Sequence, residues 1–153
     1  MQRLFNNLYL YFIFRTFYVS QKGVLSMPNP AILFYSPSPV PYAPKLRQLC
    51  AVQGIRLRVV EPDDLGRPLS ALAQGLHPVE ALNAGEALPE PLLVFCHFSD
   101  KQLDRALLSL RRIQVFCLKA VLTPTNAAWT PRALYKELCN ERSQLGSAHP
   151  PKG

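Results

Sequence analysis

The sequence lacks the motifs by which common nucleotide-binding and hydrolase folds are recognised. It contains no G-x-G-x-x-G, no P-loop and no G-x-S-x-G, so the glycine-rich phosphate cradles and the strained nucleophile turn of those enzymes are excluded. Its four cysteines lie 46, 21 and 22 positions apart and form no C-x-x-C pair, which leaves zinc and dithiol redox sites without a signal. We therefore predict no cofactor and no metal.

The cysteines are few and stand mostly in apolar or helical stretches. A free cysteine in such a stretch behaves as a small hydrophobic side chain. Disulfides are rare in the reducing cytoplasm and common outside it. We interpret this usage as that of a cytoplasmic protein without disulfides.

Charge of one sign is not concentrated anywhere along the chain. The 17 Lys and Arg residues exceed the 10 Asp and Glu residues and give a net charge of +7, but the longest basic run is Arg111-Arg112. A nucleic-acid-binding surface needs basic residues clustered on one face. We interpret the scattered charges as a solvated surface, and we do not expect nucleic acid as a partner.

A long apolar run is also missing. Residues 1–26 are rich in Phe and Tyr, but only Leu8–Phe14 is uninterrupted, far short of the roughly 20 residues that span a membrane. No small-x-small cleavage site follows, so a signal peptide is excluded too. Lys22-Gly23-Val24 can be encoded by a purine-rich ribosome-binding sequence shortly before Met27. We hypothesise that Met27 is the true start and that residues 1–26 are a gene-calling extension.

Four stretches predict β-strands. Ala31–Tyr35 (AILFY) and Leu92–Phe98 (LLVFCHF) are apolar almost throughout, which is typical of strands buried on both faces. In Ile55–Val60 apolar residues alternate with arginines, which predicts an edge strand or one with a wet face. Val115–Leu122 is the fourth predicted strand.

Helices are predicted between and after these strands. Ser99 is an N-cap with Gln102 as its capping-box partner, and Thr130 caps the last helix, where Pro131 occupies the first helical position. Gly54 ends the first helix as a C-cap. The predicted helical segments are 43–53, part of 65–75, the stretch from Ser99 to Arg112, the stretch from Thr130 onward, and one turn around Val79–Leu82.

Strands that alternate with helices predict a three-layer α/β/α, Rossmann-like domain with a four-stranded, mostly parallel sheet. The first and third strands look doubly buried, and the arginine-bearing second strand looks like an edge, so we favour the strand order 2-1-3-4. We expect one domain at residues 27–142 and a disordered tail at 143–153. The sequence shows no internal repeat.

Polar side chains follow the predicted strands, and ligands of open α/β sheets bind beyond the carboxyl ends of the strands. In the order 2-1-3-4 the switch point falls between the first and third strands, which would bring Ser36 and Ser38 near His97 and Ser99. The loop after the fourth strand adds further polar groups. The candidate binding residues are Ser36, Ser38, His97, Ser99, Thr123, Thr125, Asn126 and Trp129.

Each candidate also has a structural alternative. His97 could be a general base, whereas a lone histidine at a strand end is more often a satisfied structural group. Thr123–Asn126 could bind phosphate at the N-terminus of the last helix, or could tie the loop to its own backbone. Trp129 could stack on a ligand or anchor the core. Lys119 is better explained as a snorkelling edge-strand lysine than as a catalytic amine.

The segment KAVLTPTNAAWTPRALYKELCNER resembles the C-terminal signature of a small bacterial family of domains of unknown function. Its pattern is a Lys-Ala-Val-Leu-Thr strand, an Asn, a Trp and a closing helix. LLVFCHFSDKQLDRALLSLRR resembles the preceding strand and helix, and the resemblance extends over residues 30–142. The positions that match the signature are Lys119, Thr123, Asn126, Trp129 and Glu141. The resemblance implies a short cytoplasmic α/β domain of bacteria and supplies no activity.

Two classes of function remain open. The first is a non-catalytic binding or regulatory module whose loop 123–129 engages a protein partner or an anionic small molecule. The second is an enzyme that acts on an anionic or phosphorylated small molecule through His97 and the Thr/Asn loop. The sequence offers no acid–base pair and no cofactor motif, which favours the binding module.

Overall fold

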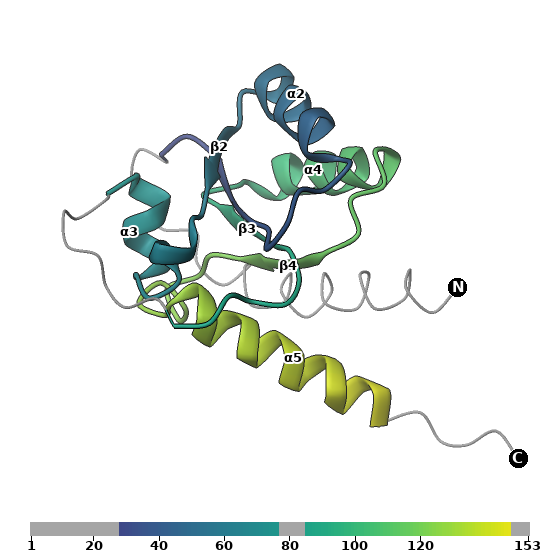
Figure 1. Ribbon diagram of the computed structural model, residues 1–153. Helices are drawn as coiled ribbons and strands as arrows, with labels where there is room; N and C mark the ends of the chain where they lie inside the picture. The colour runs from purple at the N-terminus through teal and green to yellow at the C-terminus, as the bar shows by residue number, and fades with distance from the viewer. Residues whose placement is uncertain (1–27, 77–84, 148–153) are drawn as a thin grey trace, which may run out of the picture.

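A computed structural model describes residues 28–76 and 85–147. The predictions for residues 1–26, for a helical turn around Val79–Leu82 and for the end of the tail fall outside the described residues. Figure 1 shows the elements in chain order. They are β1 (Ala31–Tyr35), α2 (Ala43–Gln53), β2 (Arg56–Val59), a short 3-10 helix η1 (Pro62–Asp64), α3 (Leu69–Gln74), β3 (Leu92–Cys96), α4 (Asp100–Arg112), β4 (Leu118–Val121) and α5 (Pro131–Ser147).

The four strands form one sheet in the order β2-β1-β3-β4, which confirms the predicted strand order. β1 is parallel to β2, and β3 is parallel to β4. Two of the three strand pairs are therefore parallel, and the fold class is confirmed as α/β with a mostly parallel sheet. The buried apolar strands β1 and β3 lie in the centre, and β2 and β4 lie at the edges of the described sheet.

The central pair departs from a Rossmann-like sheet because β1 and β3 are antiparallel, with Ala31 opposite Cys96 and Tyr35 opposite Leu92. The carboxyl ends of β1 and β2 therefore lie on one side of the sheet, along the edge formed by the strand ends. Those of β3 and β4 lie along the opposite edge of strand ends. The right-handed crossover rule orients strands within each β-α-β unit only. It does not constrain β3 relative to β1, because it applies only to strands that are already parallel.

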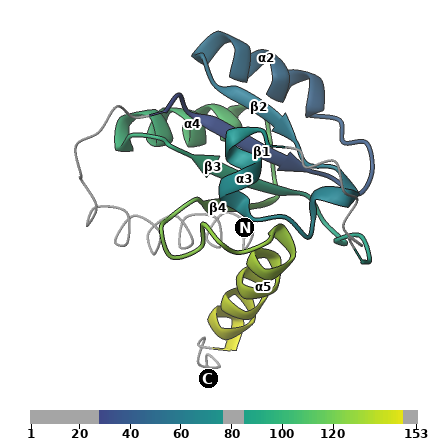
Figure 2. The same ribbon diagram turned by 90° about the vertical axis from the view of Figure 1, so that its left-hand side faces the viewer.

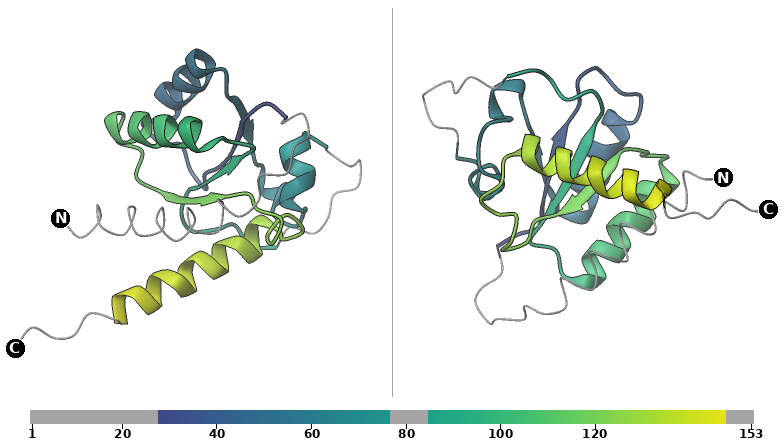
Figure 3. Two further views of the ribbon diagram at one scale, coloured as in Figure 1. Left: turned by 180° about the vertical axis from the view of Figure 1, so that it is seen from behind. Right: turned by 90° about the horizontal axis from the view of Figure 1, so that it is seen from below.

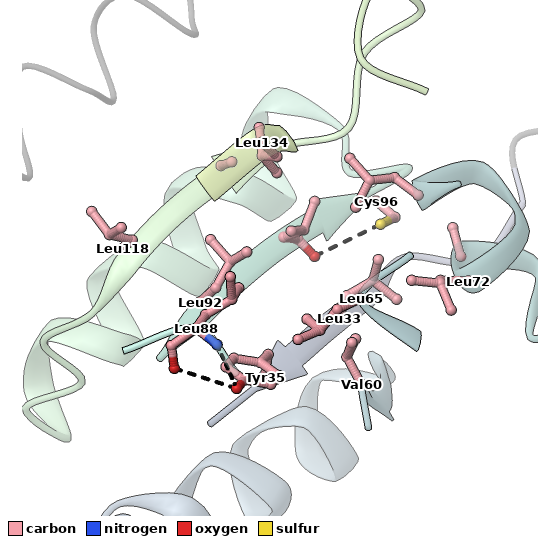
Figure 4. Close-up of a cluster of buried hydrophobic side chains, with 14 of the residues drawn as sticks. Leu33, Tyr35, Val60, Leu65, Leu72, Leu88, Leu92, Cys96, Leu118 and Leu134 are labelled. Atoms are coloured by element: carbon pink, nitrogen blue, oxygen red, sulfur yellow. Dashed lines mark hydrogen bonds between the residues drawn. The ribbon is translucent and has the colours of Figure 1, made fainter. Parts of the chain in front are cut away.

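Helices cover both faces of the sheet, as the predicted three-layer architecture requires (Figures 1 and 2). On one face α2 and α4 bury Leu46, Cys50 and Leu110 against Ile32 and Phe95. On the other face α3 and α5 pack on alternate residues of the same strands. That second cluster contains Leu33, Tyr35, Val94, Leu69, Leu72, Leu134 and Leu138, and Figure 4 draws several of its members.

The helix ends follow the predicted local signals. Gly54 takes a left-handed φ of 67° at the end of α2, where a side chain would be strained. At the start of α4 the Ser99 hydroxyl accepts from the Gln102 N–H at 3.3 Å, and Gln102 Oε1 accepts from the Ser99 N–H at 2.9 Å. This reciprocal pair is the predicted capping box.

α5 is longer than predicted. It runs to Ser147, so residues 143–147 are helical where the sequence predicts the beginning of a disordered tail. The Ser143 hydroxyl donates to the Cys139 carbonyl one turn earlier at 2.9 Å. Such a bond gives the hydroxyl of a serine inside a helix a partner on the helix itself. Figure 3 shows α5 running obliquely across the sheet.

Candidate functional site

The carboxyl ends of β3 and β4 bring six of the eight candidate residues to one edge of the sheet, here called the β3–β4 edge. The Leu122 N–H donates to the Phe95 carbonyl at 2.8 Å, so the two strands stay joined up to the point where they end. Ser99 follows β3, and the candidates that follow β4 lie in the loop 123–129. The residues at the β3–β4 edge are His97, Ser99, Thr123, Thr125, Asn126 and Trp129.

Ser36 and Ser38 do not join them, which corrects the predicted meeting of four polar groups at a switch point. Tyr35 lies opposite Leu92, at the start of β3, so the residues after β1 lie at the far edge. A five-residue strand spans about 15 Å, which separates the two groups beyond contact. The Ser36 hydroxyl instead donates to the Ser38 carbonyl within its own turn.

Asn126 organises the 123–129 loop from inside. Its side chain is 4% exposed. The amide oxygen accepts from the Thr123 N–H at 2.8 Å, and the amide nitrogen donates to the Val121 carbonyl at 3.0 Å. The Asn126 N–H donates to the Thr123 hydroxyl at 3.3 Å, and its carbonyl accepts from the Trp129 N–H at 2.9 Å. The loop is thereby tied to its own backbone, as the structural alternative predicted for it.

The same loop supports a helix from elsewhere in the chain. The carbonyls of Ala127 and Trp129 accept from the N–H groups of Ser70 and Leu69, at 3.0 and 2.8 Å. α3 begins after Pro68 and has no side-chain cap of its own. The first N–H groups of a helix need acceptors from outside it, and the loop carbonyls supply them. Trp129 is half-buried against the core beneath α3 and α5, as its anchoring alternative predicted.

His97 leaves β3 in a left-handed conformation, with φ of 62°. Few non-glycine residues adopt this conformation, and histidine is among the more tolerant. Burial lowers the pKa of His97, so its imidazole is neutral at pH 7. A neutral imidazole can accept a proton or a hydrogen bond at one nitrogen. His97 makes no hydrogen bond to another residue that the structure describes.

Lys119 turns inward at the edge strand β4. Its ammonium donates to the Val115 and Cys117 carbonyls at 3.0 and 3.2 Å, and burial lowers its pKa. The edge position agrees with the sequence interpretation, but the head group binds main-chain carbonyls of the connection from α4. Its observed contacts are structural.

Sequence reasoning missed a carboxylate network at the start of β3. Glu90 accepts from Arg142 through both of its oxygens, at 2.8 and 3.3 Å, and from the Tyr135 hydroxyl at 3.0 Å. The Arg142 hydrogen bond holds the pKa of Glu90 below its usual value. The partners stand 45 and 52 positions from Glu90, so no local spacing could have indicated the network.

The buried ion pair of Asp64 and Arg67 was missed as well. The two side chains approach at 3.5 Å and are almost completely buried. Asp64 also accepts from the Glu61 N–H at 3.0 Å. Charged residues are rarely buried unless they are paired, and the sequence marks this stretch only as a polar turn after β2.

The described residues hold no group of three or more His, Cys, Asp or Glu side chains that could bind a metal ion. A void of about 10 Å³ lies in the core, where Leu33, Val94 and Pro131 contribute to its apolar wall. It is at the lower limit for one water molecule and offers no polar partner to hold one. No helix within residues 28–76 and 85–147 combines the length and apolar character needed to cross a membrane.

Comparison with known proteins gives one match, over the second half of the chain. Residues 91–145 match the model of a domain of unknown function, DUF3783. Neither the curated proteins nor the solved structures gave a match. The matched segment contains the KAVLT strand, Asn126 and Trp129 on which the resemblance rests, whereas residues 30–90 lie outside it. The chain therefore carries a DUF3783 domain at residues 91–145, which spans β3, α4, β4 and nearly all of α5.

Proposed function

We propose that this chain is a non-catalytic binding module that recognises a protein partner through the β3–β4 edge. The observation that carries the proposal is the construction of the 123–129 loop. Asn126 fixes the loop from inside through five hydrogen bonds, while Pro124, Thr125 and Ala128 are exposed on its outside. A loop that is already ordered loses little conformational entropy on binding.

The composition of the edge supports binding rather than chemistry. Thr123, Thr125 and Ser99 offer hydroxyls, which donate and accept hydrogen bonds but have no acid–base function near pH 7. Within the described part of the chain, no carboxylate makes a hydrogen bond to His97. The usual catalytic arrangement, in which a base is oriented by a third group, therefore receives no support at this edge.

The second candidate function is an enzyme that acts on an anionic small molecule at the same edge. One observation favours it: the neutral imidazole of His97 follows β3 in a rare backbone conformation, and such conformations are more frequent at functional sites. Thr123 and Thr125, at the same edge, would supply hydroxyl donors. His97 is the residue whose replacement separates the two candidate functions.

A cytoplasmic, bacterial setting also belongs to the proposal. It is supported by the four cysteines, which are free thiols in the structure, two of them fully buried, and by the resemblance of the segment 119–142 to a bacterial family.

A photo-crosslinking experiment tests the binding module. A benzophenone amino acid is placed at Thr125 of the full chain, and the matched control carries it at Ser38, which is also exposed but lies at the opposite edge. We expect one discrete crosslinked partner from Thr125 and none from Ser38. Equal labelling from both positions would contradict the proposal.

A thermal-shift screen tests the alternative. The full chain is heated with ATP, GTP, inorganic phosphate, sugar phosphates, MgCl₂ and ZnCl₂ in turn. A ligand present at a hundred times its dissociation constant adds about 2.7 kcal/mol of stability. A shift that His97→Asn abolishes would favour the enzyme, and an absence of shifts together with a Thr125 crosslink would favour the binding module.

A further inference from the structure

We infer that the chain consists of two diverged copies of one β-α-β-α unit, residues 31–76 and 92–147, which complete each other's core across a pseudo-twofold axis. The inference is independent of the proposed function. It assigns residues 31–76, which lie outside the DUF3783 match, as the partner that the DUF3783 unit requires.

The two halves contain the same elements at the same spacing. Each runs strand, helix, strand, helix: β1-α2-β2-α3 and β3-α4-β4-α5. The second strand starts 25 residues after the first in one half (31 to 56) and 26 residues after it in the other (92 to 118). The second helix starts 38 residues after the first strand in one half (31 to 69) and 39 in the other (92 to 131).

The sheet places the two halves around a common axis. The β1–β3 ladder has five residue pairs, and Leu33–Val94 is its centre, so the register is symmetric about that pair. The first helices of both halves lie on one face, and the second helices lie on the other. Leu69 and Pro131, the first residues of α3 and α5, line the same small void beside Leu33 and Val94. The two second helices therefore start side by side at the axis.

The loops that follow β2 and β4 repeat a local structure. Residues 61–67 read EPDDLGR, and residues 123–129 read TPTNAAW, with proline second and a buried Asp64 or Asn126 fourth, each 4% exposed. The N–H of the first residue donates to the side chain of the fourth, at 3.0 Å to Asp64 and 2.8 Å to Asn126.

Two main-chain bonds of these loops also correspond. The N–H of the fourth residue donates to the carbonyl of the first, at 2.9 and 3.2 Å, and the N–H of the seventh donates to the carbonyl of the fourth, at 3.0 and 2.9 Å. Each loop then reaches a helix with a proline at its start, Pro68 before α3 and Pro131 in α5. Three matched hydrogen bonds and the matched prolines at the second position, Pro62 and Pro124, make an accidental similarity of two turns a poor explanation.

Neither half could bury its own core. Without the first half, β3 would lose every hydrogen bond that it makes to β1, and the apolar faces of Val94 and Leu92 would meet solvent. Unpaired strand edges and exposed apolar faces are strongly disfavoured. The second half in turn caps the first, because Ala127 and Trp129 accept from the first N–H groups of α3. The DUF3783 unit is thus half of a folded domain.

Amide hydrogen exchange in the full chain tests the equivalence of the loops. The variants are Asp64→Ala, Asp64→Asn, Asn126→Ala and Asn126→Asp, and the amides followed are those of Glu61 and Thr123. We expect each alanine variant to speed exchange at its own loop by about tenfold or more. Asp64→Asn and Asn126→Asp each keep an oxygen acceptor for the N–H of the first loop residue. Each should therefore retain more protection than the alanine variant, even though Asn126→Asp loses the donor to the Val121 carbonyl and Asp64→Asn loses the charge that faces Arg67.

The alignment of the two loops also supplies the controls for the exchange experiment. Asp63→Ala and Thr125→Ala remove the exposed third residue of each loop and should change neither amide. The Leu33 amide, in the central ladder, reports global unfolding, so a merely unstable variant is distinguished from a locally opened loop. If Asp64→Asn exposed Glu61 as fully as Asp64→Ala does, the loops would not be equivalent and the inference would fall.

Cleavage of the full chain tests whether each half needs the other in order to fold. A protease site is inserted between Gly85 and Glu86, both exposed. We expect the cleaved halves to remain a 1:1 complex with unchanged circular dichroism. Neither half should be a folded monomer after the two are separated in urea, and the folded complex should return when they are mixed. Self-pairing of the second half into a dimer would support the inference further. A second half that refolded alone as a monomer would overturn it, as would halves that failed to recombine.

Discussion

Asn126 shows how one buried amide can fix a loop of seven residues. Both polar atoms of its side chain make hydrogen bonds: the amide oxygen accepts from Thr123, and the amide nitrogen donates to Val121. A buried polar atom that loses its partner costs far more than the net value of the original bond. The residue is therefore a structural support for the β3–β4 edge, and in the proposed binding module the exposed Thr125 is the residue that would contact the partner.

We expect Asn126→Ala to lower the free energy of unfolding by about 2–3 kcal/mol, because the Thr123 N–H and the Val121 carbonyl lose their buried partner. Urea unfolding followed by circular dichroism measures the change. Thr125→Ala is the matched control, since an exposed substitution stays within about 0.5 kcal/mol. Equal stability of the two variants would mean that water replaces the amide without cost.

His97 makes stability depend on pH. Burial lowers its pKa in the folded state, so the unfolded chain binds its proton more readily. Stability is then present above pH 6.5, the unfolded value, and is lost as the pH falls from there toward the folded pKa. His97→Asn removes the titrating group and tolerates the left-handed backbone. We expect the loss of stability between pH 7.5 and 5.5 to be smaller in the variant, as thermal unfolding would show. Parallel pH profiles would refute this.

At the scale of elements, α5 is attached to the rest of the molecule at its start and again along its later turns. Its N-terminus lies in the core beside Leu69, and its later turns reach the segment before β3 through Glu90. The network combines a two-pronged arginine pair with a tyrosine hydroxyl. It lies near the surface, with the Arg142 and Glu90 side chains 41% and 33% exposed, so solvent screens it.

We expect Arg142→Ala to cost about 0.5 kcal/mol at pH 7, the range of partly exposed ion pairs. Arg142 lowers the pKa of Glu90, so the pair stabilises the fold above the unfolded carboxyl value. That contribution disappears as the pH falls through the lower, folded value. Urea unfolding should therefore separate the variant from wild type by more at pH 7 than at pH 3. Lys136→Ala, exposed on the same helix, should match wild type at both.

At the scale of the whole molecule, the central strands hold the two halves together. Leu33 and Val94 face each other at the centre of the antiparallel ladder, under the first residues of α3 and α5. Figure 4 shows Leu33 within this cluster, and it shows the Tyr35 hydroxyl bonded to the backbone of Leu88. A change at this point acts on both halves together.

We expect Leu33→Ala to lower the free energy of unfolding by about 3 kcal/mol, the usual cost of a large-to-small change in a core. The two halves should still unfold in one transition. Leu33→Met conserves volume and should cost less than about 1.5 kcal/mol, and Val52→Ala, at an 80% exposed position, should cost nearly nothing. Two separate transitions would contradict a shared core.

The candidate site was predictable in part. Strand ends and turn chemistry located the 123–129 loop correctly, because its polar residues follow an apolar strand and precede a proline-initiated helix. The partners of Ser36, Ser38 and Glu90 were not predictable, because they depend on which sheet edge each strand end occupies. Whether the six residues at the β3–β4 edge bind anything stays a prediction.

The sequence by itself determined the elements, their order in the sheet and their caps, since apolar runs, arginine alternation and Ser, Gly and Pro signals act over a few residues. Tertiary structure alone decided that β1 and β3 run in opposite directions. Alternation of apolar and polar residues fixes the face and register of a strand but not its direction, and the crossover rule applies only within a parallel β-α-β unit. The antiparallel pairing of β1 and β3 separates Ser36 and Ser38 from the six candidate residues at the β3–β4 edge. It also relates the two halves by a twofold axis, and so reveals a repeat that cannot be recognised in the sequence.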